Sequence, residues 1–173
     1  EISACLVGSE MCIRDRVYPT AYLGAPCIIG NKTEVRPGAF IRGNALVGDN
    51  CVVGNSTELK NVILFDNVQV PHYNYVGDSI LGYKSHMGAG SITSNVKSDK
   101  FPVVIHNEGE EIETGRKKVG AMLGDCVEVG CNSVLNPGTV IGRDASVYPT
   151  SCVRGVVPER CIYKAKGNIA VKK

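Results

Sequence analysis

The segment from Val70 to Asn95, VPHYNYVGDSILGYKSHMGAGSITSN, contains two of the three histidines of the chain, several glycines and few charges. Within it, His72 precedes Tyr75 by three residues, and a Gly-Ala-Gly tripeptide leads toward Asn95. A neutral imidazole can accept a proton near neutral pH, and glycine lets the backbone approach a ligand closely. The segment is therefore either an active site or a packed structural repeat that happens to contain polar residues.

A six-residue period governs most of the chain on both sides of this segment. Aliphatic residues recur every six positions from Val17 to Leu59 and from Leu123 to Val153, and the residue four places after each is usually small. Such a period is too short for a pair of helices, but it fits one flat face of a parallel β-helix, with a short strand and then a tight corner. Three faces would close one triangular coil.

The period is interrupted twice. It slips between Phe65 and Val76, where Pro71 takes an aliphatic position, and it stops between residues 96 and 118. The second segment is charged at both ends and contains a β-branched run and a Glu-Gly turn, which predicts a projecting loop and is compatible with a hairpin. Interruptions of a regular solenoid cost stability, so we expect function near them. His72 and Asn95 border the two interruptions.

Composition limits the classes of function. A chain of 173 residues is enough for one domain, and a net charge of +2 gives no electrostatic case for nucleic acid or a membrane surface. No apolar run is long enough to span a bilayer. The eight cysteines contain no CxxC and do not cluster with histidine at ligand spacing, which argues against a disulfide framework and against zinc. Cys27 and Cys51 occupy small inward positions and are predicted to be packed thiols. A reduced, cytoplasmic setting fits best.

The first sixteen residues need a separate interpretation. The stretch CLVGSEMCIRDR, from Cys5 to Arg16, looks like the translation of a sequencing-library adapter, so we interpret residues 1–16 as a scar that is not native. The chain also begins with Glu1 rather than Met, which fits a gene fragment. The alternative is a genuine first coil, since Met11 is in phase with the repeat, but Asp15 would then occupy a small inward position.

Two motifs carry a family resemblance. The hexapeptide pattern resembles the hexapeptide-repeat family, whose members form left-handed β-helices and are typically trimers. H-x-x-Y-x-G-D at residues 72–78, followed by G-A-G-x-I-T-x-N at residues 88–95, is similar to the acetyltransferase domain of the bifunctional enzyme that makes UDP-N-acetylglucosamine, and to related sugar-1-phosphate acetyltransferases. The likeness implies an all-β, left-handed parallel β-helix over residues 17–163, with one projecting loop at 96–118. A basic C-terminal tail follows at residues 164–173.

The resemblance also assigns roles to individual residues. His72 matches the general base that takes a proton from the attacking amine. A group of polar and charged residues matches contacts to an acceptor that carries a phosphate: Arg36 or Arg42, Lys60, Tyr75, His86, Asn95 and Lys100. Arg36 has the Pro-Gly of the motif, whereas Arg42 has the better spacing to Lys60. His86 stands where the family usually has Asn, which leaves the choice of acceptor open.

The donor implied by the resemblance is acetyl-CoA. Backbone amides near Ala89 match the groups that hold the thioester oxygen, and Cys131 stands near the donor where the family often has Ser. Lys164 and Lys166 could meet the phosphates of coenzyme A, although an ordinary solvated tail explains them equally well. No metal is expected to take part in the transfer.

The sequence therefore predicts an acetyl-CoA-dependent N-acetyltransferase that acts on an amino-sugar phosphate, works as a homotrimer and uses direct attack without a covalent enzyme intermediate. One alternative is a non-catalytic β-helix that trimerises or regulates a sugar-phosphate nucleotidyltransferase. Another is a hexapeptide carbonic anhydrase, but His72, His86 and His106 lack its close H-x4-H pair. Nucleotidyl transfer is not expected, since no Gly-rich, Arg- and Lys-bearing signature is present.

Overall fold

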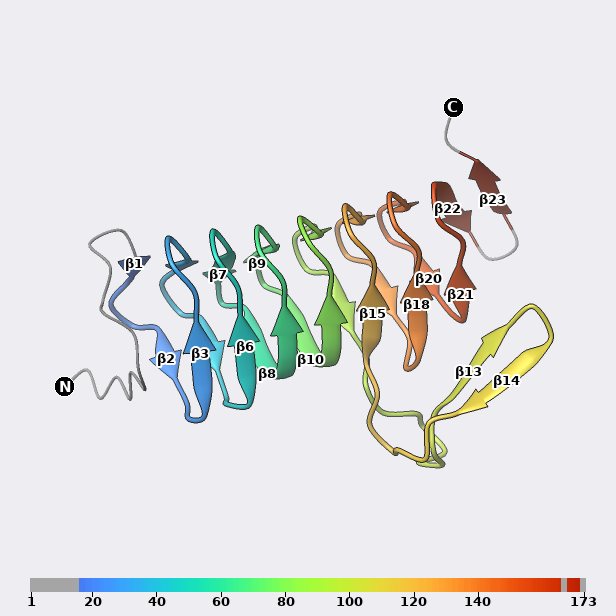
Figure 1. Ribbon diagram of the computed structural model, residues 1–173, viewed down its shortest axis with the longest axis horizontal. Helices are drawn as coiled ribbons and strands as arrows, with labels where there is room; N and C mark the ends of the chain where they lie inside the picture. Colours follow the sequence, from blue (N-terminus) through green and yellow to red (C-terminus); the bar gives the residue numbers. More distant parts are fainter. Residues whose placement is uncertain (1–15, 166–167, 172–173) are drawn as a thin grey trace.

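The computed structural model describes residues 16–165 and 168–171. The described chain forms a parallel β-solenoid of about eight turns, with its long axis horizontal in Figure 1 and no helix in these ranges. The predicted all-β solenoid is confirmed. The interpretation of residues 1–16 as a scar concerns residues that lie, apart from Arg16, outside the described ranges. The structure describes no helix long and apolar enough to cross a membrane.

Each coil contributes one strand segment to each of three faces, which we call A, B and C, and the corners between them are A/B, B/C and C/A. Face A contains β1 (Arg16–Val17), β4 (Glu34–Val35), β7 (Val52–Asn55), β9 (Gln69–His72), β11 (His86–Met87), β16 (Glu128–Val129), β19 (Ser146–Val147) and β22 (Cys161–Ala165). Face B contains β2 (Tyr22–Leu23), β5 (Phe40–Ile41), β12 (Ile92–Thr93), β17 (Val134–Leu135) and β20 (Cys152–Val153). Face C contains β3 (Cys27–Ile29), β6 (Ala45–Val47), β15 (Ala121–Leu123), β18 (Thr139–Ile141) and β21 (Val156–Val157). Two longer strands, β8 (Glu58–Leu64) and β10 (Tyr75–Leu81), continue from face B into face C. We number the coils 1 to 8 by their face A strands, from β1 to β22.

The core is the row of inward residues that the six-residue period predicts. Aliphatic side chains such as Val35, Ile41 and Leu135 are fully buried and stack on their equivalents in adjacent coils. The small inward residues are buried too, and their hydroxyls bond backbone carbonyls at the corners, as Thr57 Oγ1 does to the Val70 carbonyl at 2.9 Å. Cys51 belongs to this group, and burial raises the pKa of its thiol to about 11. It is one of the two packed thiols that the pattern predicts, and the other, Cys27, is only half-buried at the edge of the core.

The change of period is a corner shortened by one residue, which lies within β8 and again within β10 rather than between Phe65 and Val76, and the stack of strands is not interrupted. Val76 pairs with Leu59, and β9 continues through the buried Pro71. The shortening falls at the B/C corner, where β8 and β10 turn without ending. Asn61 and Asp78 form these turns with φ values of 51° and 50°, a left-handed conformation that Asn and Asp tolerate better than most residues.

The second interruption is a projecting hairpin, as the loop prediction allowed. The chain leaves coil 5 after β12 and returns before β15, and an antiparallel bridge between Val96 and Lys118 closes the base. Beyond the base, β13 (Val104–Asn107) pairs with β14 (Glu110–Glu113), and the hairpin extends beside the last coils (Figure 1). At the C-terminus, β23 (Asn168–Val171) turns back antiparallel to β22, so the described part of residues 164–173 includes a strand.

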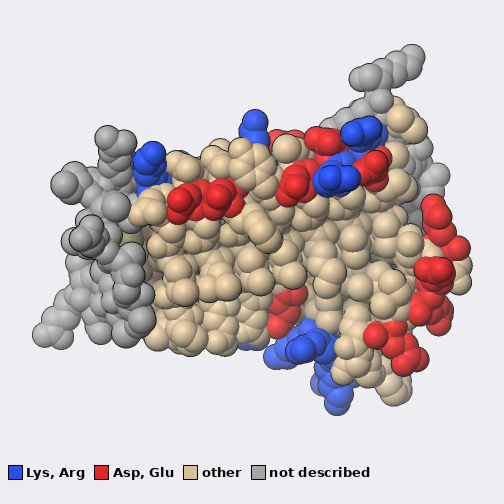
Figure 2. Space-filling view, viewed as in Figure 1, with Lys and Arg blue, Asp and Glu red and all other residues tan. Residues whose placement is uncertain are grey.

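The outward residues differ sharply between the faces. The outward row of face C is aliphatic in every coil that contributes to it: Ile28, Leu46, Ile63, Ile80, Met122, Val140 and Val156. Figures 1 and 2 show the strands of this face crossing the front of the solenoid, in a broad area without charged side chains. By contrast, the outward row of face A carries charged and polar residues, among them Glu34, His86 and Glu128.

Candidate functional site

His72 ends β9 at the A/B corner of coil 4, with its side chain exposed. Its backbone is fixed from both sides: its amide donates to Asn74 Oδ1 at 3.1 Å, and its carbonyl accepts from the Gly90 amide of the next coil at 3.0 Å. Asn74 is itself buried and donates to the carbonyls of Gly88 and Ser91. The imidazole makes no hydrogen bond within the described part of the chain. The fold thus holds the backbone firmly and leaves the ring available.

Tyr75 and Asn95 meet on face B, one strand segment beyond His72. Asn95 Nδ2 donates to the Tyr75 hydroxyl at 3.2 Å and also to Asp78 Oδ2. Both amide protons are therefore used, so the side-chain oxygen of Asn95 remains as an acceptor. The pKa of Tyr75 is raised, first by burial and then by the negative charge of Glu58, so the phenol keeps its proton and can donate it to a ligand.

Lys60 lies beside this pair at the B/C corner of coil 3. It is in register with Gly77 in coil 4, and its Nζ lies 3.9 Å from Asp78 Oδ2. Asp78 thereby contacts both Lys60 and Asn95, and it also accepts from Asn61 Nδ2 at 2.9 Å. One carboxylate orients two of the predicted acceptor-binding side chains.

The structure separates the two arginines that the sequence left as alternatives. Arg42 lies at the B/C corner of coil 2, directly before Lys60 in the stack, since its amide donates to the Leu59 carbonyl at 2.8 Å. Its guanidinium binds Glu58 at 2.8 Å, which raises the pKa of Arg42. Arg36 lies at the A/B corner of the same coil and pairs with Glu34 at 3.2 Å. Arg42, not Arg36, is therefore the arginine beside Lys60.

Sequence reasoning assigned no role to two carboxylates in this group. Glu58 stands next to Tyr75 in the outward row of face B and neutralises Arg42, while Asp78 faces Lys60. An anionic ligand must therefore share or displace these partners. Asp78 is part of the H-x-x-Y-x-G-D motif, but its contact with Lys60 depends on the pairing of Gly77 with Lys60, which the sequence alone does not display.

The residues predicted to bind the donor line up along the A/B corner. Ala89 lies one coil beyond His72, and its carbonyl accepts from the amide of Asn132, next to Cys131 in coil 6. The amides of Gly88 and Gly90 bond the carbonyls of Val129 and His72, whereas the Ala89 amide makes no hydrogen bond within the described residues. A side chain at position 88 would come within 2.7 Å of the Cys131 amide, so glycine is required for this close stacking. The free amide at Ala89 can donate a hydrogen bond to a ligand oxygen.

The same corner continues to the last coil. Tyr148 lies in coil 7, and the Lys164 Nζ of coil 8 lies 5.8 Å from the centre of its ring, in a cation–π contact. Lys164 is thus on the corner that carries His72, Ala89 and Cys131. Lys166 lies outside the described residues.

His86 and Lys100, two of the residues predicted to bind the acceptor, do not lie beside Tyr75 and Asn95 in a single chain. His86 points outward from face A and pairs through Nδ1 with Glu128 Oε2 at 2.8 Å. Lys100 is exposed at the start of the insertion, in a turn that its amide closes with the Lys97 carbonyl. Their contact with an acceptor stays a prediction.

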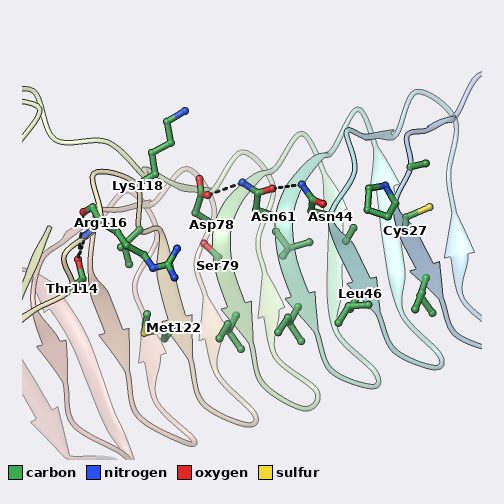
Figure 3. Close-up of a pocket in the computed structure, with 18 residues that line it drawn as sticks. Cys27, Asn44, Leu46, Asn61, Asp78, Ser79, Thr114, Arg116, Lys118 and Met122 are labelled. Carbon is green, nitrogen blue, oxygen red and sulfur yellow. Dashed lines mark hydrogen bonds between the residues drawn. The ribbon is translucent and has the colours of Figure 1, made fainter. Parts of the chain in front are cut away.

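A groove of about 840 Å³ runs along face C from coil 1 to coil 5 (Figure 3). Its floor is the aliphatic row, and one wall is a hydrogen-bonded series in which Asn44 donates to Asn61 and Asn61 to Asp78, each at 2.9 Å. Thr114, Arg116 and Lys118 close it from the base of the insertion. Asp78 is thus shared between this groove and the Lys60 site.

The described residues contain no group of three or more His, Cys, Asp or Glu side chains that could hold a metal ion. His72 lies at the A/B corner and His86 on face A, while His106 lies on the hairpin, where it pairs with Glu111 at 3.3 Å.

Comparison with known proteins identifies the family of the chain. The model of the GMPPB C-terminal domain family matches residues 23–165. The chain belongs to this family. It is 37% identical over 139 residues to the bifunctional protein GlmU of Methanococcus maripaludis, covering 79% of this chain and 33% of GlmU. It is 33% identical over 117 residues to a bifunctional sugar-1-phosphate nucleotidylyltransferase/acetyltransferase of Sulfurisphaera tokodaii, covering 68% of this chain and 29% of that protein.

This GMPPB C-terminal-type domain is homologous to the C-terminal hexapeptide acyltransferase domain of GlmU. It spans about a third or less of the length of these curated relatives. Among solved structures, the N-acyltransferase AntD from Bacillus cereus, in complex with dTDP-4-amino-4,6-dideoxyglucose and coenzyme A, matches with a TM-score of 0.65. It is 17% identical, and the match covers 84% of this chain and 83% of AntD. At this identity the match supports the fold alone.

Proposed function

We propose that this domain transfers an acetyl group from acetyl-CoA to the amino group of an amino-sugar phosphate such as glucosamine 1-phosphate. The observation that carries the proposal is the convergence of Arg42, Lys60, Tyr75 and Asn95 in consecutive coils of face B, beside an exposed His72. Two cations and a phenol donor suit a phosphate, and an amide oxygen suits a sugar hydroxyl or the amine. The names of the curated relatives support the same reaction class.

The transfer follows from these positions. The neutral amine nitrogen forms a bond with the thioester carbonyl carbon, and His72 takes the proton that this nitrogen loses. The carbonyl oxygen becomes negative and is stabilised by the Ala89 amide, which is free to donate. The carbon–sulfur bond then breaks, and the thiolate of coenzyme A takes up the proton that His72 holds. The products are the N-acetyl sugar phosphate and free coenzyme A.

The A/B corner is the expected path for the donor. Adjacent coils lie about 4.8 Å apart, so the edge from His72 in coil 4 to Lys164 in coil 8 is about 19 Å long. An extended pantetheine arm suits such an edge, with its thioester at Ala89 and its phosphates near Lys164. Cys131 lies between these two points.

The proposal is tested by mixing the protein with acetyl-CoA and glucosamine 1-phosphate and measuring the release of free thiol. Release that depends on both substrates, together with an N-acetylated product in the mass spectrum, is the expected result. Amino-sugar phosphates that differ in the sugar would then define the acceptor. No release with any of them would exclude the transfer.

A homotrimer is part of the same proposal. The aliphatic row of face C leaves Ile28, Leu46 and Ile80 between 40% and 59% exposed, which is unusual for a contiguous surface of a monomer. Packing of this face against other copies would remove it from water. Light scattering after gel filtration should give three times the mass of the chain, and Leu46→Asp should reduce that mass if the row is at the contact.

The second candidate is a non-catalytic domain that trimerises or regulates a sugar-phosphate nucleotidyltransferase. Two ion pairs favour it: Arg42 pairs with Glu58, and Lys60 pairs with Asp78, so both cations already have an acidic partner without a phosphate. This candidate predicts trimers without thiol release, whereas acetyl transfer with an intact trimer would exclude it.

A further inference from the structure

Two aromatic rings stand in the outward row of face B on the N-terminal side of the acceptor group. Tyr22 in coil 1 and Phe40 in coil 2 are in register, with ring centres 5.3 Å apart and planes tilted by 54°. They are 58% and 42% exposed. Rings so exposed add little to the solenoid core, so their place next to the candidate site calls for a different role.

The row that contains these rings leads directly to the site. Phe40 pairs with Glu58, and Glu58 pairs with Tyr75, so Tyr22, Phe40, Glu58 and Tyr75 occupy successive coils. At about 4.8 Å per coil, Tyr22 is about 14 Å from Tyr75 along the axis. Arg42 follows Phe40 by two residues in the same coil and therefore projects to the same side of the face.

In order of coils, the groups are thus a base at the A/B corner of coil 4, cations at the B/C corners of coils 3 and 2, and aromatic rings on face B in coils 2 and 1. A sugar 1-phosphate needs only the base and the cations, and has no part that would contact the aromatic rings. A sugar linked to a nucleoside diphosphate has the same order of parts: an amine, a pyrophosphate and then a planar base. Bases stack on exposed aromatic side chains, and Arg and Lys bind phosphates.

We propose that Tyr22 and Phe40 bind the base of a nucleoside diphosphate, so that the acceptor class of this domain includes amino sugars linked to a nucleotide. This inference rests on the proposed function and extends its substrate class. Glu58 lies between the rings and Tyr75, and its negative charge repels an anion. This repulsion is reduced because Glu58 is bound to Arg42, and Lys60 adds a second positive charge beside it.

Two other exposed rings, at the C/A corner, lack this setting. Phe65, 53% exposed, and Tyr83, 47% exposed, follow β8 and β10 at the C/A corner, on the side of the solenoid away from Arg42 and Lys60. Phe65 is therefore a matched control for Phe40: the same side chain, similarly exposed, at another corner.

The experiment measures binding of UDP, GDP, dTDP and inorganic pyrophosphate to the full chain by isothermal titration calorimetry. In the wild type, the three nucleotides should bind more tightly than pyrophosphate. Phe40→Ala should weaken their binding about five- to a hundredfold, the range for losing a stacked base, and Phe40→Leu should not restore it. Phe65→Ala should bind all four ligands as the wild type does.

Three results would overturn the inference. Nucleotides could bind no better than pyrophosphate, Phe65→Ala could lose as much affinity as Phe40→Ala, or Phe40→Ala could reduce the oligomer mass, which would make the rings a contact between copies. No acetyl donor is needed in these titrations, so they are independent of the proposed reaction. Ring-dependent nucleotide binding in a protein that never releases thiol would refute the proposed transfer and leave a nucleotide site.

Discussion

Replacing Lys60 with methionine tests the acceptor site most directly, because methionine keeps the apolar stem and removes the charge. Lys60 Nζ lies 3.9 Å from Asp78, and the side chain is only 22% exposed. A charge-assisted contact with a phosphate oxygen contributes about 1.5–3 kcal/mol. The ion pair that it replaces is worth about 0–1 kcal/mol. The net loss on substitution is therefore about 0.5–3 kcal/mol, which corresponds to a rise in KM of about two- to 150-fold.

The assay is thiol release at fixed acetyl-CoA, with glucosamine 1-phosphate and plain glucosamine as acceptors. Lys60→Met should raise KM for the phosphorylated acceptor alone, since plain glucosamine has no phosphate to lose. Lys84→Ala removes an exposed lysine after β10, at the C/A corner, and should change neither value. Equal losses for the two acceptors would show that Lys60 maintains structure, and the substrate class would have to be withdrawn.

Three further predictions concern the other parts of the site. His72→Ala should lower kcat by about a hundred- to ten-thousandfold, the usual effect of losing a general base, and full activity would mean that His72 is structural. Arg42→Ala should raise KM for glucosamine 1-phosphate about tenfold. Arg36→Ala removes a similarly paired arginine and should change this KM less than about twofold. A larger effect of Arg36→Ala than of Arg42→Ala would place the phosphate at the A/B corner instead. Coenzyme A should slow the alkylation of Cys131, followed by peptide mass spectrometry, but not that of the half-buried Cys126 after β15; equal protection of both would place the donor elsewhere.

The core of the fold could be predicted from the sequence because every coil requires the same kind of side chain at the same inward position. Residues such as Ile41 and Leu135 fill the interior of a flat face, and Ala39 or Thr57 fits where a corner leaves little volume. One error of interpretation came from the shortened B/C corner. Deleting a single corner residue shifts the sequence period but leaves the coils stacked, so a change of period was mistaken for a break.

The site was predictable only in part because its residues come from different coils. The motif suggested His72, Tyr75 and Asn95, but the contacts of Asp78 depend on the stacking of Gly77 on Lys60. The motif likewise left Arg36 and Arg42 as alternatives, because its Pro-Gly favours Arg36 and its spacing favours Arg42, and the sequence does not show that they lie at different corners. Charges that compensate one another, such as Glu58 and Arg42, appear in the sequence as unrelated surface residues.

The insertion in coil 5 departs and returns at one point of the solenoid, where Val96 bridges Lys118. In a stack of this kind, each coil is stabilised by itself and its two neighbours, so a segment attached at one corner transmits little strain to the rest. Residues that close the groove, including Arg116, can therefore change in number and identity without altering the coils that hold His72. The architecture thus places the proposed site on the stacked coils and the border of the groove on a segment that can vary separately from them.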